Sequence, residues 1–404
     1  MNERNHLGWI GGTALVVAVG AGIWLGSQGL RHFDPAVTGY AIGTLIAAFA
    51  VGYRFVTWAQ RPPSRMYFRR GLELLLRRGE ASAARHVAQT SQSAVSRVSQ
   101  PAERSQVEGL QNLPRPAGLE TGDTADLEVR GTTPPAAATL RHGAGTLGHA
   151  LATKIVSQNF IRRRSPLRWV MHLCLSGGCT LAFAITFPLV FGWVHFESLP
   201  ENAEIYRVKA LGFAVDQFSV HSAKAFVMFN LLNFSAVIVL VGLVLATWRR
   251  FTDAGERATQ TFLEDILPLI LIFVVTVTGL ALTVSYHFLA GRGHALWAVV
   301  HLVSVVALLL YIPFGKLFHI FQRTCSLAVS LYKKAGEHGA RAHCRACGAD
   351  FASRMHVEDL KVVLDQLGFD YRFATPRGQI HYQDICPACR RRLMALNQGR
   401  SVGR

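Results

Sequence analysis

Four of the seven cysteines in this 404-residue sequence form two Cys-x-x-Cys pairs near its end: Cys344 with Cys347, and Cys386 with Cys389. A pair at this spacing can chelate one ion from a tight turn, and two pairs supply the four thiolates of a tetrahedral site. Gly348 follows the first pair and Pro387 lies within the second, as is typical of such turns. The pattern predicts a cytoplasmic metal-binding domain over residues 340–404, with structural zinc as the favoured ion.

The same four thiolates leave an alternative open. The pairs resemble the knuckles of zinc ribbons and of rubredoxins, and a rubredoxin-like iron centre would carry electrons. A domain this small depends on its metal to fold, and docking of a soluble partner or regulation is its expected use. Disulfides are not expected, because the tail is predicted to lie in the reducing cytoplasm. The other cysteines are interpreted as small apolar residues: Cys174, Cys179 and Cys325.

Histidines in apolar stretches form the second set of chemically useful residues. Ionisable side chains inside such stretches are costly and usually functional. His172 lies about one turn into one stretch, and His319 follows His301 by 18 residues at the ends of another. Eighteen residues are five turns of a continuous helix, so His301 and His319 are predicted to share a face, about 27 Å apart along the axis.

The elements that carry these histidines are predicted to be transmembrane helices. Half of the residues are hydrophobic and 17% are charged, which is too apolar for an ordinary soluble chain. Six stretches have the length that a helix needs to cross about 30 Å of hydrocarbon: 8–28, 36–59, 168–193, 222–247, 266–289 and 295–318. A signal peptide is the alternative for the first, but no cleavage site stands out. The predicted fold class is all-α integral membrane, with lipid as a partner.

The formal net charge of +17 is distributed around these spans. Lys and Arg residues follow the second, fourth and sixth spans and precede the third, for example Arg61, Arg168 and Arg250. By the positive-inside rule these span ends are cytoplasmic. We therefore expect a multi-pass protein of the cell membrane with both termini in the cytoplasm and residues 196–220 outside. A nucleic-acid-binding face is not expected.

The predicted domains follow from this topology. Residues 1–60 supply two N-terminal transmembrane helices, and 161–325 supply a four-helix membrane domain. Residues 61–160 are rich in Ala, Ser, Gln, Arg and Pro and are predicted to be a largely disordered basic linker. An amphipathic helix at 66–80 is the exception, either lying on the membrane surface or simply solvated.

The predicted topology brings two of the histidines to one depth. The third span runs outwards and the sixth returns, so His172 and His319 both end near the cytoplasmic surface. They can face each other across the bundle, as bis-imidazole ligation of haem requires. Gly177 and Gly178 would admit a flat macrocycle, or would serve ordinary helix packing. For each histidine the alternative is a polar interfacial residue without a ligand.

Two further charged residues lie at the same depth. Lys316 is a candidate counter-charge for haem propionates, or else its ammonium snorkels to lipid phosphates. Asp265 begins the fifth span, where a carboxylate suits a helix N-terminus, and a proton or quinone role is the alternative.

The stretch HLVSVVALLLYIPFGKLFH at 301–319 resembles the last helix of a known family of membrane cytochromes. Similar features upstream are RRSPLRWVMH, WRR at 248–250 and DILPLILIFVVTVTGL. Over roughly residues 160–325 the chain thus resembles the membrane cytochrome b subunit of respiratory nitrate reductase and heterodisulfide-reductase-type membrane subunits. The resemblance implies two stacked haems, with one helix supplying two histidines 18 residues apart. It also implies a quinone substrate and a cytoplasmic redox partner.

One position departs from the family pattern. The partner helix of the family supplies two histidines about ten residues apart, and His172 matches the first, but Ala182 stands near the second. His301 would need another partner on the outer side, where His287 and His294 also lie; the preferred candidates are His195 and His221. The expectation is one haem b, with room for a second.

The expected function is electron transfer in a respiratory oxidoreductase complex. The chain would link the quinone pool to a cytoplasmic iron–sulfur, flavin or molybdenum partner. No catalytic triad, phosphate-binding glycine loop or paired carboxylates stand out, so any substrate chemistry belongs to a partner. The alternatives are a multi-pass transporter and a haem-free membrane scaffold that works through its zinc-binding tail.

Overall fold

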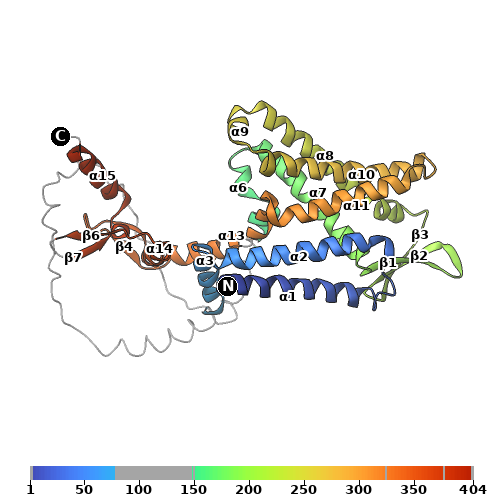
Figure 1. Cartoon of the computed structure of the whole chain (residues 1–404), viewed down its shortest axis with the longest axis horizontal. Coiled ribbons are helices and arrows are strands. Elements are labelled where there is room, and N and C mark those ends of the chain that lie inside the picture. The colour runs from blue at the N-terminus through green and yellow to red at the C-terminus, as the bar shows by residue number, and fades with distance from the viewer. Residues whose placement is uncertain (1–2, 78–147, 149–150, 324, 376–377, 402–404) are drawn as a thin grey trace, which may run out of the picture. The chain divides into compact units, whose positions relative to one another are not determined.

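The computed structural model of the chain describes residues 3–77, 148, 151–323, 325–375 and 378–401 (Figure 1). The chain divides into two compact units, Met1–Gln60 with Leu151–Thr324 and Arg61–Ala150 with Cys325–Arg404. Most of the linker that the sequence predicts to be disordered lies outside the described residues. Its last part is described and forms a π-helical turn at Leu151–Val156 and the short helix α6 (Asn159–Arg162).

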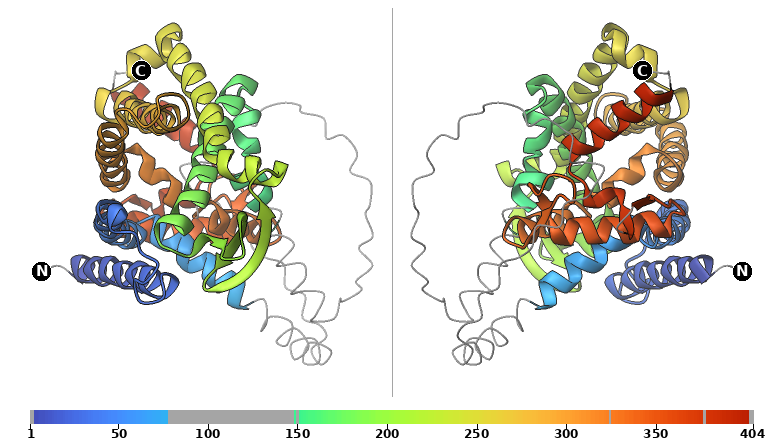
Figure 2. Two further views of the ribbon diagram at one scale, coloured as in Figure 1. Left: turned by 90° about the vertical axis from the view of Figure 1, so that its right-hand side faces the viewer. Right: turned by 90° about the vertical axis from the view of Figure 1, so that its left-hand side faces the viewer.

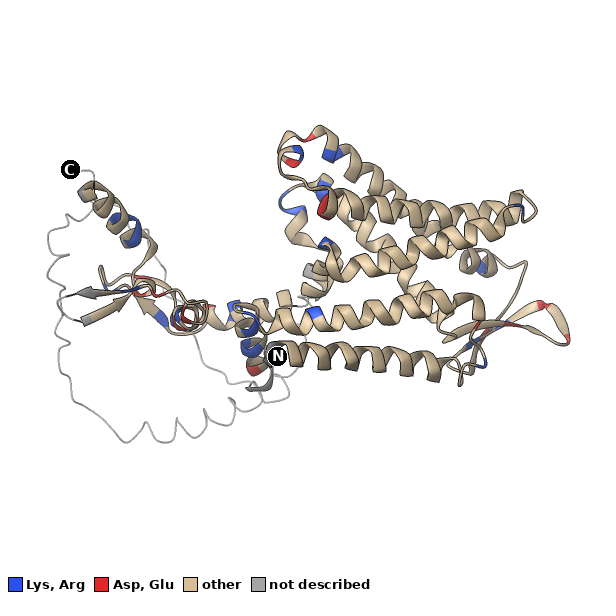
Figure 3. Cartoon of the chain, viewed as in Figure 1, with Lys and Arg blue, Asp and Glu red and all other residues tan. Residues whose placement is uncertain are grey.

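Six long apolar helices make up most of the first unit, as the sequence predicts. They are α1 (Glu3–Gly26), α2 (Thr38–Ala59), α7 (Pro166–Val190), α8 (Ala223–Thr252), α10 (Leu267–Phe288) and α11 (His294–Phe314). Each is long and apolar enough to cross a membrane. Side chains such as Phe226, Val244 and Val303 are more than half exposed, which suits lipid as the surrounding solvent. Lys and Arg gather at the helix ends and connections (Figure 3).

The two N-terminal helices pack with the others. Along the unit, α1 contacts α2, α2 contacts α11, α11 contacts α10, α10 contacts α8, and α8 contacts α7; Figure 2 views these helices close to end-on. Gly39 and Gly43 let α2 approach α11, because a Cβ atom there would lie 2.9 Å and 3.1 Å from the side chains of Leu302 and Val306. The predicted four-helix domain thus has α2 as an additional neighbour.

Helices α7 and α8 approach each other through glycines. A Cβ atom on Gly178 would lie 2.6 Å from Val239 Cγ2, and one on Gly242 would lie 2.8 Å from Leu175 Cγ. The buried Ser235 hydroxyl donates to the Gly178 carbonyl at 3.0 Å. Lipid removes the hydrophobic driving force between helices, and small residues allow the close van der Waals packing that acts in its place. Gly178 therefore serves helix packing, whereas nothing lies within 4 Å of a Cβ built on Gly177.

A three-stranded antiparallel sheet follows α7 where the sequence predicts only an external segment. Its strands are β1 (Val194–Leu199), β2 (Asn202–Ala210) and β3 (Phe213–Ser219), paired in that order. One face of the sheet buries Val208 and Phe218 with Ala225 at the start of α8. This packing ties the sheet to one end of the helices (Figure 1).

The last apolar helix is interrupted, contrary to the prediction of one continuous span to residue 318. Helix α11 ends at Phe314, because Pro313 cannot continue the hydrogen-bond ladder and Gly315 is extended. A 3₁₀ turn at Lys316–Phe318 and the short helix α12 (His319–Gln322) follow. The prediction that His301 and His319 share a face of one helix is therefore wrong: His319 belongs to a separate short helix. Two other short elements, α9 (Ala254–Thr259) and a π-helical turn at Phe262–Ile266, connect α8 to α10.

The second unit contains the cysteine tail. It contains α3 (Ser64–Arg77), α13 (Cys325–Glu337), β4 (Arg341–His343), β5 (Asp350–Ser353), α14 (Arg354–Gln366), β6 (Arg372–Thr375), β7 (Gly378–His381) and α15 (Pro387–Ser401). Strands β4 and β5 form one hairpin, and β6 and β7 form another.

Helix α3 packs against α13, an arrangement that neither sequence interpretation of the 66–80 segment anticipated. Its Gly71 lies so close to Ala328 that an added Cβ atom would be 2.6 Å from the alanine Cβ. The Tyr67 ring meets Tyr332 edge-on, with centroids 5.4 Å apart. One turn of α3 therefore contributes to the interior of the second unit.

A buried carboxylate joins α3, α13 and α14. Asp359 accepts hydrogen bonds from the Arg70 guanidinium at 2.7 Å and from the Tyr332 hydroxyl at 2.9 Å. The hydrogen bond to Asp359 raises the pKa of Arg70, and burial together with Asp359 raises the pKa of Tyr332. Because the Asp359 side chain is only 9% exposed, these partners offset the cost of burying a carboxylate there.

Adding one methyl group at the α7–α8 crossing should destabilise the first unit. We expect Gly178→Ala to lower the free energy of unfolding by about 1–3 kcal/mol, because Val239 must move to make room. Gly177→Ala is the matched control and should be neutral or stabilising by up to about 1 kcal/mol through helix propensity. Thermal unfolding of the detergent-solubilised protein, followed by circular dichroism, measures both. Equal melting temperatures for the two variants would contradict this packing.

Removing the buried carboxylate should loosen the second unit. We expect Asp359→Ala to cost about 2 kcal/mol, discounted because the Arg70 side chain is one-third exposed. The measurement is hydrogen–deuterium exchange of α3, α13 and α14. Glu358→Ala is the control, since its carboxylate is 58% exposed and it should change stability by less than about 0.5 kcal/mol. Similar exchange rates in both variants would argue against a buried Asp359 junction.

Candidate functional site

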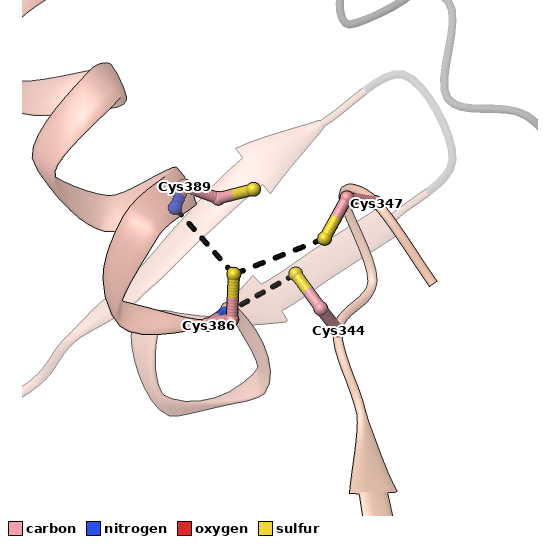
Figure 4. A group of neighbouring side chains, drawn as sticks. All are labelled: Cys344, Cys347, Cys386 and Cys389. Carbon is pink, nitrogen blue, oxygen red and sulfur yellow. Dashed lines mark hydrogen bonds between the residues drawn. The ribbon is translucent and has the colours of Figure 1, made fainter. Parts of the chain in front are cut away.

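The four tail cysteines come together at one point of the second unit (Figure 4). Their sulfur atoms all lie within 4.8 Å of one another, and Cys347 Sγ is 3.8 Å from Cys386 Sγ. Four thiolates bound to one zinc at about 2.3 Å lie about 3.8 Å apart. The cluster can therefore hold a metal ion such as zinc or iron after a small contraction.

Local backbone structure explains why the cysteines converge. Gly348, with φ of +75°, closes the turn after the first pair and donates its N–H to the Cys344 carbonyl at 2.8 Å. Pro387 begins α15, so that Cys389 lies in its first turn. The backbone N–H of Cys386 donates to Cys344 Sγ at 3.2 Å, which joins the two pairs. Such N–H donors stabilise negative sulfur.

The electrostatics of the cluster favour a cation. Burial acts to raise the pKa of the Cys386 thiol, but the Cys389 N–H and neighbouring thiols outweigh burial and hold that pKa at about 7. Burial raises the pKa of Cys347 and of Cys389. A divalent ion would release the thiol protons and take all four thiolates as ligands.

His172 and His319 also come together, in the first unit. Their ring centroids are 6.4 Å apart and the ring planes are inclined by 73°. His319 donates its Nδ1–H to the Lys316 carbonyl at 2.7 Å. His172 accepts a hydrogen bond from Arg323 Nη2 at 3.1 Å on Nε2, and its buried Nδ1 has no hydrogen-bond partner among the described residues. Sequence reasoning missed Arg323 as a neighbour of this pair, because the break after α11 brings it there.

His301 is placed beside hydroxyl groups. Its Nδ1 lies 2.9 Å from Thr278 Oγ1, whose own hydroxyl donates to the Val274 carbonyl at 2.7 Å. The imidazole is therefore the donor to Thr278. In the part of the chain that the structure describes, the aromatic neighbour of His301 is Tyr40, with centroids 6.5 Å apart, rather than either candidate histidine.

Lys316 is engaged by a carboxylate. Its ammonium lies 2.6 Å from the largely buried Asp265, which also lies 3.4 Å from Arg250. Asp265 further accepts the Thr261 N–H at 2.9 Å, so it stabilises the first turn before α10. The positive charge of Lys316 is thus already paired with a residue of its own unit.

His195 and His221, the candidate outer haem ligands, have different surroundings. His221 is exposed, and its backbone N–H approaches Ser219 Oγ at 3.3 Å. His195 Nε2 lies 3.2 Å from Glu197 Oε1, and its ring stacks on that of His32 with centroids 4.4 Å apart. Sequence reasoning missed His32 and Glu197. The alternation His195, Phe196, Glu197 was a usable signal, since it places the two polar side chains on one face of a strand.

The comparisons with known proteins are negative. No protein-family model, no curated protein and no solved structure matches the chain. The resemblance to cytochrome b subunits gains no support from these comparisons.

Breaking the cysteine cluster should release its metal. We expect Cys386→Ala to lose one metal ion per chain and to melt the tail at lower temperature, because Cys386 contacts both pairs. Elemental analysis of the full-length protein measures the loss and decides between zinc and iron. Cys174→Ala is the control and should keep the metal content of the wild type. An unchanged metal content in Cys386→Ala would rule out the four-cysteine site.

Proposed function

We propose that this protein is a membrane b-type cytochrome subunit that transfers electrons between the quinone pool and a soluble redox partner. The observation that supports this most directly is the pairing of His172 and His319 at one end of the apolar helices. Placing two adjoining imidazoles among apolar helices is costly, and such side chains are usually functional. Haem iron can take two imidazoles as its protein ligands.

The distance between the two rings fits this role. Imidazoles that bind one iron from opposite sides through bonds of about 2 Å have ring centroids about 6 Å apart, and these centroids are 6.4 Å apart. The Nδ1–H of His319 is held by the Lys316 carbonyl, which leaves its Nε2 as the ligand atom. Metal-bound histidines are typically oriented in this way.

Arg323 is the residue that must respond to haem. Its guanidinium donates to the His172 nitrogen that would bind iron, and it also lies over the Phe160 ring at 5.4 Å. A guanidinium beside the iron-binding nitrogen can pair with a carboxylate, and a haem propionate offers one. Lys316, for which the sequence left open a propionate contact or a contact with lipid phosphates, already pairs with Asp265, so we assign the propionate contact to Arg323.

The residues divide the work of electron transfer as follows. Haem b, when bound, supplies a one-electron couple. His172 and His319 would hold it, Arg323 would balance its carboxylate charge, and the apolar helices would exclude water. The quinone and the iron–sulfur, flavin or molybdenum partner are part of the proposal through the family resemblance, and the four-cysteine tail would dock that partner. One haem site is proposed, because His301 has a threonine rather than a histidine beside it.

Substituting either axial histidine should abolish the haem spectrum. Dithionite-reduced, full-length protein should show a b-type α-band, and His172→Ala and His319→Ala should each lose most of it. His287→Ala, at the other end of the helices, is the control and should keep the wild-type amount of haem per chain. A haem-free wild-type protein, purified from haem-replete cells, would sink the proposal and leave the transporter and scaffold alternatives.

The Arg323→Gln variant tests whether Arg323 balances the charge of the haem without binding its iron. This variant should retain the α-band but lower the haem midpoint potential, since removing a positive charge favours the oxidised state. If Arg323→Gln instead loses haem as completely as His172→Ala, the guanidinium does more than balance charge.

A further inference from the structure

We infer that His32, His195 and Glu197 form a second metal site, for an exchangeable divalent cation of the zinc class. The three side chains offer two imidazole nitrogens and one carboxylate oxygen, all within 4.8 Å of one another. Two histidines and one glutamate leave a fourth position open for water, as in zinc sites that exchange ligands. This site is independent of the haem proposal.

Strand alternation explains two of the three ligands. His195 and Glu197 are two residues apart on β1, so their side chains project from the same face of the sheet. Phe196 between them projects from the other face, where its ring contacts Phe218 and Phe229 at 6.2 Å and 5.4 Å. Because the aromatic core holds Phe196, the strand cannot shift its register without burying the two polar side chains.

The third ligand comes from the connection between α1 and α2. His32 donates its backbone N–H to the Ser27 carbonyl at 3.1 Å, and Ser27 is fully buried. Gly192, with φ of +71°, lies against this connection: a Cβ atom there would be 3.0 Å from the His32 carbonyl oxygen. Trp193 Nε1 donates to the Gly22 carbonyl at 2.8 Å. The close packing before β1 therefore holds His32 next to His195.

The distances are close to those of a bound ion. His195 Nε2 and Glu197 Oε1 are 3.2 Å apart, and two ligand atoms of a tetrahedral zinc ion are about 3.3 Å apart. The rings of His32 and His195 are stacked with planes only 15° apart, so the exposed His32 ring must turn for its nitrogen to point at the same ion. His195 Nδ1 is buried and has no hydrogen-bond partner among the described residues, so this imidazole is incompletely satisfied.

Lys209 acts as a built-in competitor. It pairs with His195 across the sheet, and its ammonium lies 2.7 Å from Glu197 Oε2. A divalent ion must displace this ammonium towards water. Because the Lys209 ammonium competes with the ion for Glu197, the ion is expected to exchange. Occupancy of the site would then follow the concentration of the divalent cation in the surrounding solution.

Occupancy would have a structural consequence. The ion would join the α1–α2 connection to β1, and thereby link the N-terminal helix pair to the sheet that follows α7. His195 would then bind this ion, and it would not be the second ligand of a haem bound by His301.

The test is zinc binding by the full-length protein in detergent. After weakly bound metal is removed with a chelator, the wild type should rebind one more Zn²⁺ per chain than His32→Ala or Glu197→Gln. Lys209→Met should rebind the same number as the wild type but about tenfold more tightly, because the competing charge is gone. His294→Ala, an exposed histidine elsewhere in the first unit, is the matched control.

Two further measurements distinguish loss of this site from misfolding and from metal binding by the cysteine tail. Circular dichroism melts should show that each variant remains folded. With Co²⁺ as the probe, thiolate charge-transfer bands report the tail alone and should be unchanged in His32→Ala. Equal zinc stoichiometry in wild type and His32→Ala, or weaker binding in Lys209→Met, would overturn the site.

Discussion

The cost of placing polar groups inside apolar helices is the constraint on which this structure depends. The six long helices expose Val, Leu and Phe side chains along their lengths, so unpaired polar atoms there would be expensive. Within the spans, Thr278 and Ser235 donate to backbone carbonyls. Chemistry is consequently pushed to the helix ends, where connections, strands and short helices supply partners.

The two ends of the first unit solve this constraint differently. At one end, the break after Pro313 turns the chain so that His319 and Arg323 meet His172, and a polar cluster forms between short helices. At the other, a β-sheet places His195 and Glu197 beside a connection that carries His32. In both clusters a basic side chain, Arg323 or Lys209, contacts an atom that we propose as a ligand, and it would have to move for a cofactor or an ion to bind.

The cysteine tail follows a separate logic. Its hydrophobic core is small, consisting of Ile380 and Ile385 packed with two of the cysteines and a few partly buried side chains. A bound ion would supply the stability that such a core lacks. The neighbouring helices α3, α13 and α14 are joined by the buried Asp359, so the unit is larger than the cysteine pattern alone indicates.

What the sequence by itself determined was the local part: six apolar helices, whose length and composition suffice to define them, and the four-cysteine cluster, whose two short spacings confine each pair to one turn. Tertiary structure decided the rest. The end of α11 at Phe314, the β-sheet at 194–219, the packing of α3 on α13 and the neighbours of each histidine depend on contacts between segments distant in sequence. Helical periodicity cannot reveal such contacts, because it describes which face a residue occupies and not which segment covers that face.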